Sequence, residues 1–137
     1  MKIVLNRVND AVHFEASNED GHKVQIDGAP SIGGEDKGVR PMQLLLMGLA
    51  GCSSMDVISI LKKQKQTVTD YQVIVHAERA TDQTPSLFTS IEVEFIIEGK
   101  VDTKKAERAV QLSMDKYCSV TKIMEKTAQI THKITLK

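Results

Sequence analysis

The chain has 137 residues, of which 41% are apolar and 26% charged, and its 18 Lys and Arg residues balance its 18 Asp and Glu residues. This size and composition favour one folded domain spanning residues 1–137 and argue against a largely disordered chain. A formal net charge of zero and an aromatic content of 4% argue against nucleic acid or an anionic membrane surface as a partner, because neither a basic surface nor a base-stacking platform is indicated.

The N-terminal part of the chain indicates three short strands followed by a loop. Strands are predicted at residues 3–8, 12–17 and 22–27, because turn sequences of Asn, Asp and Gly separate these segments. Residues 28–40 are rich in Gly, Pro and charge, which is typical of a surface loop. There is no apolar core of a signal peptide, and the longest apolar run, residues 44–50, is too short for a membrane-spanning helix. We therefore expect a cytoplasmic protein that does not enter the membrane.

A long helix is predicted over residues 41–65. Pro41 suits the first helical position, and the lysines near residue 65 suit the C-terminal end of a helix. The first half is apolar nearly all round, which is typical of a buried helix. At 1.5 Å per residue the helix would be roughly 35 Å long, which is long for so small a domain. It therefore either bends at Gly48 and Gly51 or is covered partly by another subunit.

Two strands follow, at residues 71–79 and 87–98, and both show alternating apolar and polar residues. The second strand would carry one apolar face and one wetter, glutamate-rich face. The apolar face would consist of Ile91, Val93, Phe95 and Ile97.

The C-terminal part predicts two helices and a final strand. Asp102 is expected to cap a helix that ends near Tyr117, and Ser119 is expected to cap a short helix at residues 120–127. Residues 130–136 form the last predicted strand. Because the strands cluster instead of alternating with helices, the sequence predicts an α+β fold in which a mainly antiparallel sheet packs on the long central helix.

Cys52 lies in the sequence GLAGCSSMD, in the middle of the predicted long helix, among small residues. Each glycine in a helix interior costs about 1 kcal/mol relative to alanine, so Gly48 and Gly51 indicate close packing or close approach of another group to the sulfur. Asp56 is one turn further along, on the same helix face. It would make a hydrogen bond or a contact to a second subunit. The alternative is that Cys52 is only a small core residue.

Cys118 is expected at or just before the start of a short helix. Backbone N–H groups there lower the pKa of a thiol, and Lys116 and Lys122 would add positive potential. The alternative is a helix-boundary cysteine without chemistry. A permanent disulfide with Cys52 is disfavoured in a reducing cytosol, but two cysteines permit a redox cycle.

The sequence favours neither a metal site nor a bound cofactor. The histidines show no metal-ligand spacing to each other or to the cysteines, and we expect them to be surface or edge residues of strands. A hydrolytic pair of one cysteine and one histidine stays open, because neighbours in space need not be neighbours in sequence. The Gly33-Gly34 pair lacks the context of a phosphate-binding loop. The histidines are His13, His22, His76 and His132.

The segment RPMQLLLMGLAGCSSMDVISILKKQK, with LFTSIEVEFIIEG and KYCSVTKIMEKTAQITHKI further on, resembles the OsmC/Ohr family, and most closely its small OsmC-like branch. This resemblance implies an intertwined homodimer in which the sheets wrap around two long central helices, with active sites near the interface. It also implies thiol-dependent reduction of hydroperoxides, preferably organic ones, in oxidative stress defence. Cys52 would be the peroxidatic cysteine and Cys118 the resolving one. An external dithiol, such as a lipoyl group, would be the reductant, and no metal, haem or flavin would be needed.

The chain departs from the family pattern around the thiol. Family members carry a glutamate where this chain has Met42, and they use an arginine to hold the thiolate. The candidates for that arginine are Arg7, Arg40, Arg79 and Arg108. Two other functions stay open on the same scaffold, namely related thiol chemistry on reactive sulfur species and non-catalytic binding of an apolar ligand.

Overall fold

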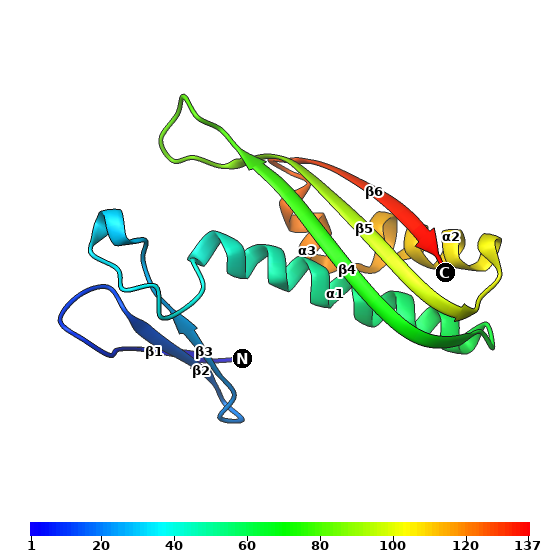
Figure 1. Cartoon of the computed structure of the whole chain (residues 1–137), viewed down its shortest axis with the longest axis horizontal. Coiled ribbons are helices and arrows are strands. Elements are labelled where there is room, and N and C mark those ends of the chain that lie inside the picture. The colour runs from blue at the N-terminus through cyan, green and yellow to red at the C-terminus, as the bar shows by residue number, and fades with distance from the viewer. The chain divides into compact units, whose positions relative to one another are not determined.

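The computed structural model describes residues 1–137 and confirms the predicted α+β class. The chain forms two compact units, Met1–Met47 and Gly48–Lys137, and helix α1 (Pro41–Lys63) begins in the first and continues through the second. Each unit contains one three-stranded sheet. Figure 1 shows the elements in chain order from blue to red.

The first unit contains the three strands that the turn sequences predict. Strands β1 (Ile3–Arg7), β2 (Phe14–Asn18) and β3 (Lys23–Ile26) pair antiparallel in that order. A short 3₁₀ helix, η1 (Pro30–Ile32), lies in the predicted loop. The two ends of the loop meet at Val39. The Asp27 N–H donates to the Val39 carbonyl at 3.1 Å, and the Val39 N–H donates to the Gln25 carbonyl of β3 at 3.0 Å.

Asp27 organises this loop although it is almost fully buried. Its carboxylate accepts hydrogen bonds from the backbone N–H groups of Gly28 at 2.7 Å, Lys37 at 3.1 Å and Glu35 at 3.2 Å. Burial by itself raises the pKa of this carboxyl, but the three N–H groups together outweigh it, so the pKa of Asp27 lies below its ordinary value of 3.8. The charged carboxylate therefore stabilises the loop.

Replacing Asp27 with asparagine is expected to lower the midpoint of thermal unfolding by a few degrees at neutral pH, because an amide offers one acceptor oxygen to three donors. The folded-state pKa is lowered, so the contribution of Asp27 is complete above its ordinary pKa of 3.8 and is lost as the pH falls through the folded-state pKa. The difference between Asp27→Asn and wild type should therefore narrow towards pH 3, about one unit below that ordinary value. Circular dichroism melts measure both effects, with Asp20→Asn in an exposed turn as the control. Equal losses at neutral and acid pH would contradict the assigned role.

The second unit contains a mixed sheet of order β4-β5-β6. Strands β4 and β5 pair antiparallel, as expected, but β5 and β6 pair parallel. Parallel pairing arises because the chain crosses over between them through helical segments. The strands are β4 (Thr67–Arg79), β5 (Phe88–Lys100) and β6 (Gln129–Leu136), and the crossover consists of α2 (Thr103–Leu112), a π-helical turn η2 (Ser113–Tyr117) and α3 (Ser119–Met124).

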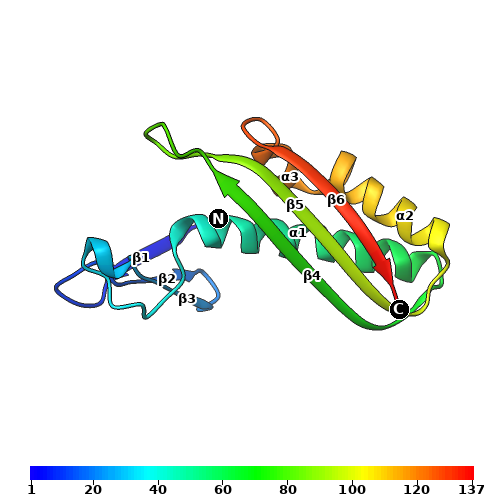
Figure 2. The same ribbon diagram turned by 45° about the horizontal axis from the view of Figure 1, so that its top comes forward.

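The core of the second unit lies on one face of this sheet. The predicted alternation on β5 is confirmed, and the four residues of its predicted apolar face are at most 1% exposed, namely Ile91, Val93, Phe95 and Ile97. Four residues of α1 at four-residue spacing are fully buried as well, namely Leu49, Ser53, Val57 and Leu61. Figures 1 and 2 both show this part of α1, together with α2 and α3, on the same face of the sheet. Burying one such apolar side chain stabilises a fold by about 1.5–3 kcal/mol, so this face dominates the stability of the unit.

The prediction that the first half of α1 is buried all round is wrong for the single chain. Leu45 and Met47 are about half exposed, at 49% and 51%, and Met55 is 77% exposed. The physical reason is that within each chain only one stripe of the helix meets the core of the second unit, so the apolar residues elsewhere on the helix have no cover.

Helix α1 is also long and apolar enough to cross a membrane, with a mean hydropathy of 1.9 over 18 residues. The unbroken apolar run of residues 44–50 underestimates the apolar length of the helix. The small residues that follow this run interrupt it but scarcely lower the mean hydropathy. Core helices of soluble proteins meet the same criterion, and Leu49, Val57 and Leu61 pack in the core of the second unit.

Candidate functional site

The fold brings the two cysteines together. Cys52 lies on α1, Cys118 lies between η2 and α3, and both are free thiols. Their sulfur atoms and a carboxylate oxygen of Asp56 all lie within 4.8 Å of one another. The two sequence-predicted site residues therefore share one site, and a third potentially charged group faces them.

Asp56 reaches the sulfurs because it follows Cys52 by one helical turn, as the sequence spacing predicts. Its carboxylate also accepts a hydrogen bond from the hydroxyl of Ser113 at 3.0 Å, which confirms the expected hydrogen bond. The Ser113 hydroxyl lies 3.3 Å from the backbone oxygen of Ser53 as well, so it bridges η2 and α1. Ser113 is a residue of the site that sequence reasoning missed.

The π-helical turn explains how Ser113 and Cys118 come to face α1. The N–H of Cys118 donates to the backbone oxygen of Ser113 at 2.8 Å, a bond that spans five residues instead of four. Such widened turns occur often at functional sites. The sequence predicted an ordinary helix as far as Tyr117, since no residue pattern distinguishes a π turn from an α turn.

Cys118 itself caps α3, which corrects the prediction that Ser119 is the cap. The Cys118 sulfur accepts a hydrogen bond from the N–H of Thr121 at 3.4 Å, and α3 begins at Ser119. A thiol sulfur is a weak acceptor, yet the Cys118 sulfur takes the capping role that was expected of the Ser119 hydroxyl. The Cys118 side chain is fully buried.

The prediction of a lowered pKa for Cys118 is also wrong. Burial raises the pKa of this thiol above its ordinary value of 9.0, hydrogen bonding from Thr121 opposes the rise, and the neighbouring Cys52 adds to it. The expected positive potential from Lys116 and Lys122 is directed elsewhere. The Lys116 ammonium lies over the ring of Tyr117, and Lys122 pairs with Glu125 at 3.1 Å.

The surroundings of Cys52 differ from those of Cys118, because Cys52 is partly exposed. The glycines beside it are not explained by packing within the chain. A Cβ added at Gly48 or at Gly51 would meet no atom within 4 Å. The predicted close approach therefore does not come from the same chain, and the space beside this part of α1 is free for another group.

No candidate arginine forms a hydrogen bond or ion pair with either cysteine. Three of them donate to carbonyl or carboxylate oxygens of nearby residues in sequence, namely Arg7, Arg40 and Arg79. Arg108 is exposed on α2, and Met42 is half-buried on α1. The activation of Cys52 by one of these arginines stays a prediction.

Tyr71 on β4 is a second residue that sequence reasoning missed. Its hydroxyl is buried without a hydrogen-bond partner, and burial raises the pKa of Tyr71 to about 12. Ser54, two residues after Cys52, opposes this rise in the pKa of Tyr71, and the Ser54 hydroxyl donates to the backbone oxygen of Ala50 at 2.6 Å. Tyr71 therefore places a buried hydroxyl near Ser54 of α1.

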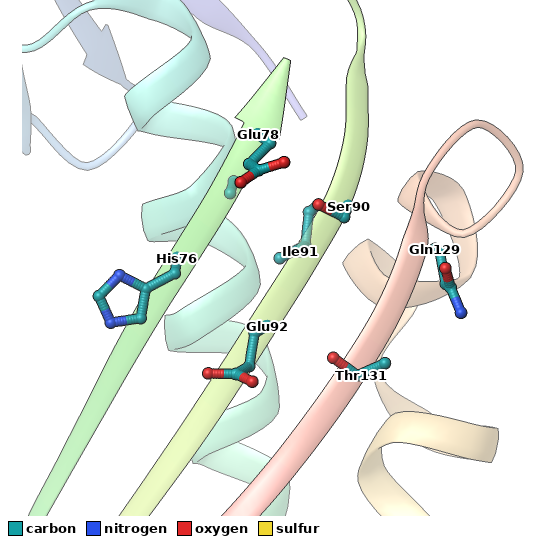
Figure 3. A pocket seen from close by; sticks show the side chains of 8 residues that line it. His76, Glu78, Ser90, Ile91, Glu92, Gln129 and Thr131 are labelled. Atoms are coloured by element: carbon teal, nitrogen blue, oxygen red, sulfur yellow. The ribbon is translucent and has the colours of Figure 1, made fainter. Parts of the chain in front are cut away.

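One depression, on the sheet of the second unit, does not contain the cysteines. It measures about 560 Å³ and is lined by strand residues that include His76, Glu78, Glu92 and Thr131. Figure 3 shows these side chains on the three strands, with a helix behind the sheet. A smaller depression of about 480 Å³ reaches the cysteine site instead, because Asp56, Ser59 and Lys63 of α1 line it with Leu112 and Tyr117.

No histidine belongs to the group formed by Cys52, Asp56 and Cys118. His76 and His132 lie on β4 and β6, as predicted. His13 precedes β2 and is largely buried, with its ring nitrogen 2.8 Å from the side-chain oxygen of Gln25, so the expectation of a surface residue is wrong for it. No cysteine–histidine hydrogen bond is present, and the chemistry of the site rests on two sulfurs and one carboxylate.

Comparison with known proteins places this fold and this cysteine pair in context. The protein-family model described as OsmC-like protein matches residues 34–133. Protein YhfA of Escherichia coli K12 is 42% identical over 125 residues, which cover 90% of this chain and 89% of YhfA.

Solved structures agree with this match. A hypothetical protein from Aquifex aeolicus VF5 is 31% identical with a TM-score of 0.82, and the match covers 99% of this chain and 96% of that one. The organic hydroperoxide resistance protein OhrB of Bacillus subtilis is 23% identical with a TM-score of 0.62, covering 99% and 96% of the two chains, and shares the fold. The family match spans well over half of the sequence and includes both cysteines, so the chain belongs to the OsmC-like family.

Proposed function

We propose that the protein is a cytoplasmic thiol peroxidase that reduces organic hydroperoxides, with Cys52 as the peroxidatic cysteine and Cys118 as the resolving cysteine. The observation that carries the proposal is the pair of free sulfurs within 4.8 Å of each other, one partly exposed and one fully buried. Structures named as organic hydroperoxide resistance proteins share the fold, which supports the choice of substrate.

The reaction balances with the two thiols and one external dithiol. The Cys52 thiolate attacks the terminal peroxide oxygen, the O–O bond breaks, and the alkoxide takes up a proton and leaves as an alcohol. Cys52 is then a sulfenic acid. The Cys118 sulfur attacks the Cys52 sulfur, water leaves, and a disulfide forms. Two exchange steps with an external dithiol, such as a lipoyl group, restore both thiols and release the oxidised reductant.

The assignment of the two roles follows from exposure and electrostatics. A hydroperoxide can reach the partly exposed Cys52 but not the buried Cys118. Burial and the neighbouring Cys52 both raise the pKa of Cys118, so Cys118 stays protonated while Cys52 reacts. Once Cys52 is a neutral sulfenic acid, it no longer raises the pKa of Cys118 through its negative charge. The Cys118 thiol then ionises more easily.

An apolar alkyl hydroperoxide suits this site better than hydrogen peroxide. The depression beside Asp56 is lined by the apolar side chains of Ile60 and Leu112 and by the ring of Tyr117. Removing an alkyl chain from water contributes about 0.8 kcal/mol per CH₂ group. The preference for organic over inorganic peroxide should therefore increase with the length of the alkyl chain.

The active form is proposed to be an intertwined homodimer. The uncovered apolar residues of α1 and the open space at Gly48 and Gly51 are explained if a second α1 packs there. The first unit also exposes apolar strand residues, with Ile3 65% and Leu5 54% exposed. Exposed apolar surface on this scale is typical of an interface rather than of a free monomer.

Replacing Met55 with lysine is expected to shift the protein from dimer to monomer, with Kd for dimerisation rising at least tenfold, because a charge would replace a side chain buried between two helices. Sedimentation velocity at micromolar concentration measures the shift. Gln111→Lys, on the exposed side of α2, is the matched control and should stay dimeric. A wild-type protein that sediments as a folded monomer of 15.2 kDa would contradict the interface.

The direct test of the proposed function is consumption of cumene hydroperoxide by the purified protein with dihydrolipoamide as reductant. We expect multiple turnovers per chain and slower turnover with hydrogen peroxide. If no peroxide is consumed while both thiols remain free and the protein remains folded, the peroxidase proposal is wrong.

A further inference from the structure

We infer that the reduced site binds one thiophilic divalent cation of the Zn²⁺ type, through the sulfurs of Cys52 and Cys118 and a carboxylate oxygen of Asp56. The inference does not depend on peroxidase activity, since it concerns the thiol form of the site alone. It departs from the sequence-based expectation of no metal site, which rested on the spacing of cysteines and histidines alone. That spacing misses ligands that the fold brings together from α1 and from the turn before α3.

The geometry is close to what a metal requires. All three donor atoms lie within 4.8 Å of one another. In a tetrahedral zinc site with Zn–S near 2.3 Å and Zn–O near 2.1 Å, ligand atoms lie about 3.6–3.8 Å apart. The longest donor–donor separation therefore needs to shorten by about 1 Å for all three atoms to bind one ion.

The charge of the site also favours a cation. The Asp56 carboxylate takes part in none of the ion pairs of the chain. Lys63 lines the same depression as Asp56 but does not form an ion pair with it. With both thiols ionised the site would gather three negative charges without a positive partner. A bound divalent cation neutralises most of that charge, and sulfur ligands select soft or borderline metals over Mg²⁺ and Ca²⁺.

Supporting contacts and access are both present. The hydroxyl of Ser113 donates to Asp56 at 3.0 Å, and metal-ligating carboxylates are normally oriented by such a hydrogen bond. The depression of about 480 Å³ opens beside Asp56 and gives a cation a route from solvent. It also leaves room for a water molecule as a fourth ligand, the arrangement of zinc sites with three protein ligands.

The test is calorimetric titration of Zn²⁺ into wild-type protein reduced with a phosphine, which does not compete as a thiol would. We expect saturable binding of one ion per chain. The variants Cys52→Ser, Cys118→Ser and Asp56→Asn should each weaken binding at least tenfold, by analogy with the loss on disturbing metal sites. The matched control is Asp82→Asn, in an exposed loop, which should bind as wild type does.

X-ray absorption at the zinc edge of the wild-type complex decides the ligands without relying on any variant. We expect two sulfur scatterers at about 2.3 Å and oxygen scatterers at about 2.0–2.2 Å. Absence of saturable binding, a coordination shell of nitrogen and oxygen alone, or unchanged affinity in both cysteine variants would overturn the inference.

Discussion

Replacing Cys52 with serine is expected to abolish hydroperoxide reduction, lowering turnover by at least about 10³-fold. The nucleophile in this chemistry is a thiolate, and a serine hydroxyl neither ionises near neutral pH nor forms a stable oxidised state. The measurement is peroxide consumption with dihydrolipoamide, alongside circular dichroism to show that the variant is folded. The substitution is conservative in size, and Cys52 is not part of the fully buried stripe of α1.

The same variant separates catalysis from simple ligand binding. If the apolar surface beside Cys52 only held a ligand, Cys52→Ser would bind it almost unchanged, and wild type would consume no peroxide. Rapid peroxide consumption by a folded Cys52→Ser protein would show that another group carries the reaction, and the assignment of Cys52 would be wrong.

Replacing Cys118 with serine is expected to leave a sulfenic acid on Cys52 after one equivalent of hydroperoxide. Without the second sulfur within 4.8 Å, resolution depends on an encounter with the external dithiol. Turnover should then fall by roughly tenfold or more, because an intramolecular step becomes bimolecular. A dimedone adduct on Cys52, identified by peptide mass spectrometry, measures the trapped species.

The matched control for this prediction is Ser119→Ala. Ser119 is exposed, adjacent to Cys118 and not the cap of α3, so this variant should form the disulfide as wild type does. Undiminished turnover in Cys118→Ser, with no dimedone adduct, would exclude Cys118 as the resolving cysteine.

Much of the second unit follows from local sequence pattern. Apolar residues stand at every second position from Ile91 to Ile97, and this period places them on one face of a strand whatever the strand pairs with. Asp102 caps α2 as predicted, with its carboxylate accepting from the N–H of Lys105 at 3.0 Å. Such features depend on neighbours in sequence, so the sequence alone reveals them.

The parts that sequence reasoning missed depend on contacts between distant residues. The pKa of Cys118 rises because the fold buries it against α1, whereas the local pattern of a helix start predicts the opposite. The π turn that positions Ser113 is recognised by a hydrogen bond from the Cys118 N–H to the Ser113 carbonyl five residues earlier, and no local residue pattern predicts that bond. Likewise, the apolar residues of α1 predict that the helix is buried, but they do not indicate whether the same chain or a second chain buries it. This is why they predict burial that one chain does not provide.

The measurement that tests the central claim most directly is the mass of the wild-type protein after reaction with one equivalent of cumene hydroperoxide, followed by non-reducing peptide mapping. We expect each chain to lose two hydrogen atoms and to yield a peptide pair joined through Cys52 and Cys118, both reversed by dihydrolipoamide. An unchanged mass with both cysteines still open to alkylation would contradict a redox pair at this site.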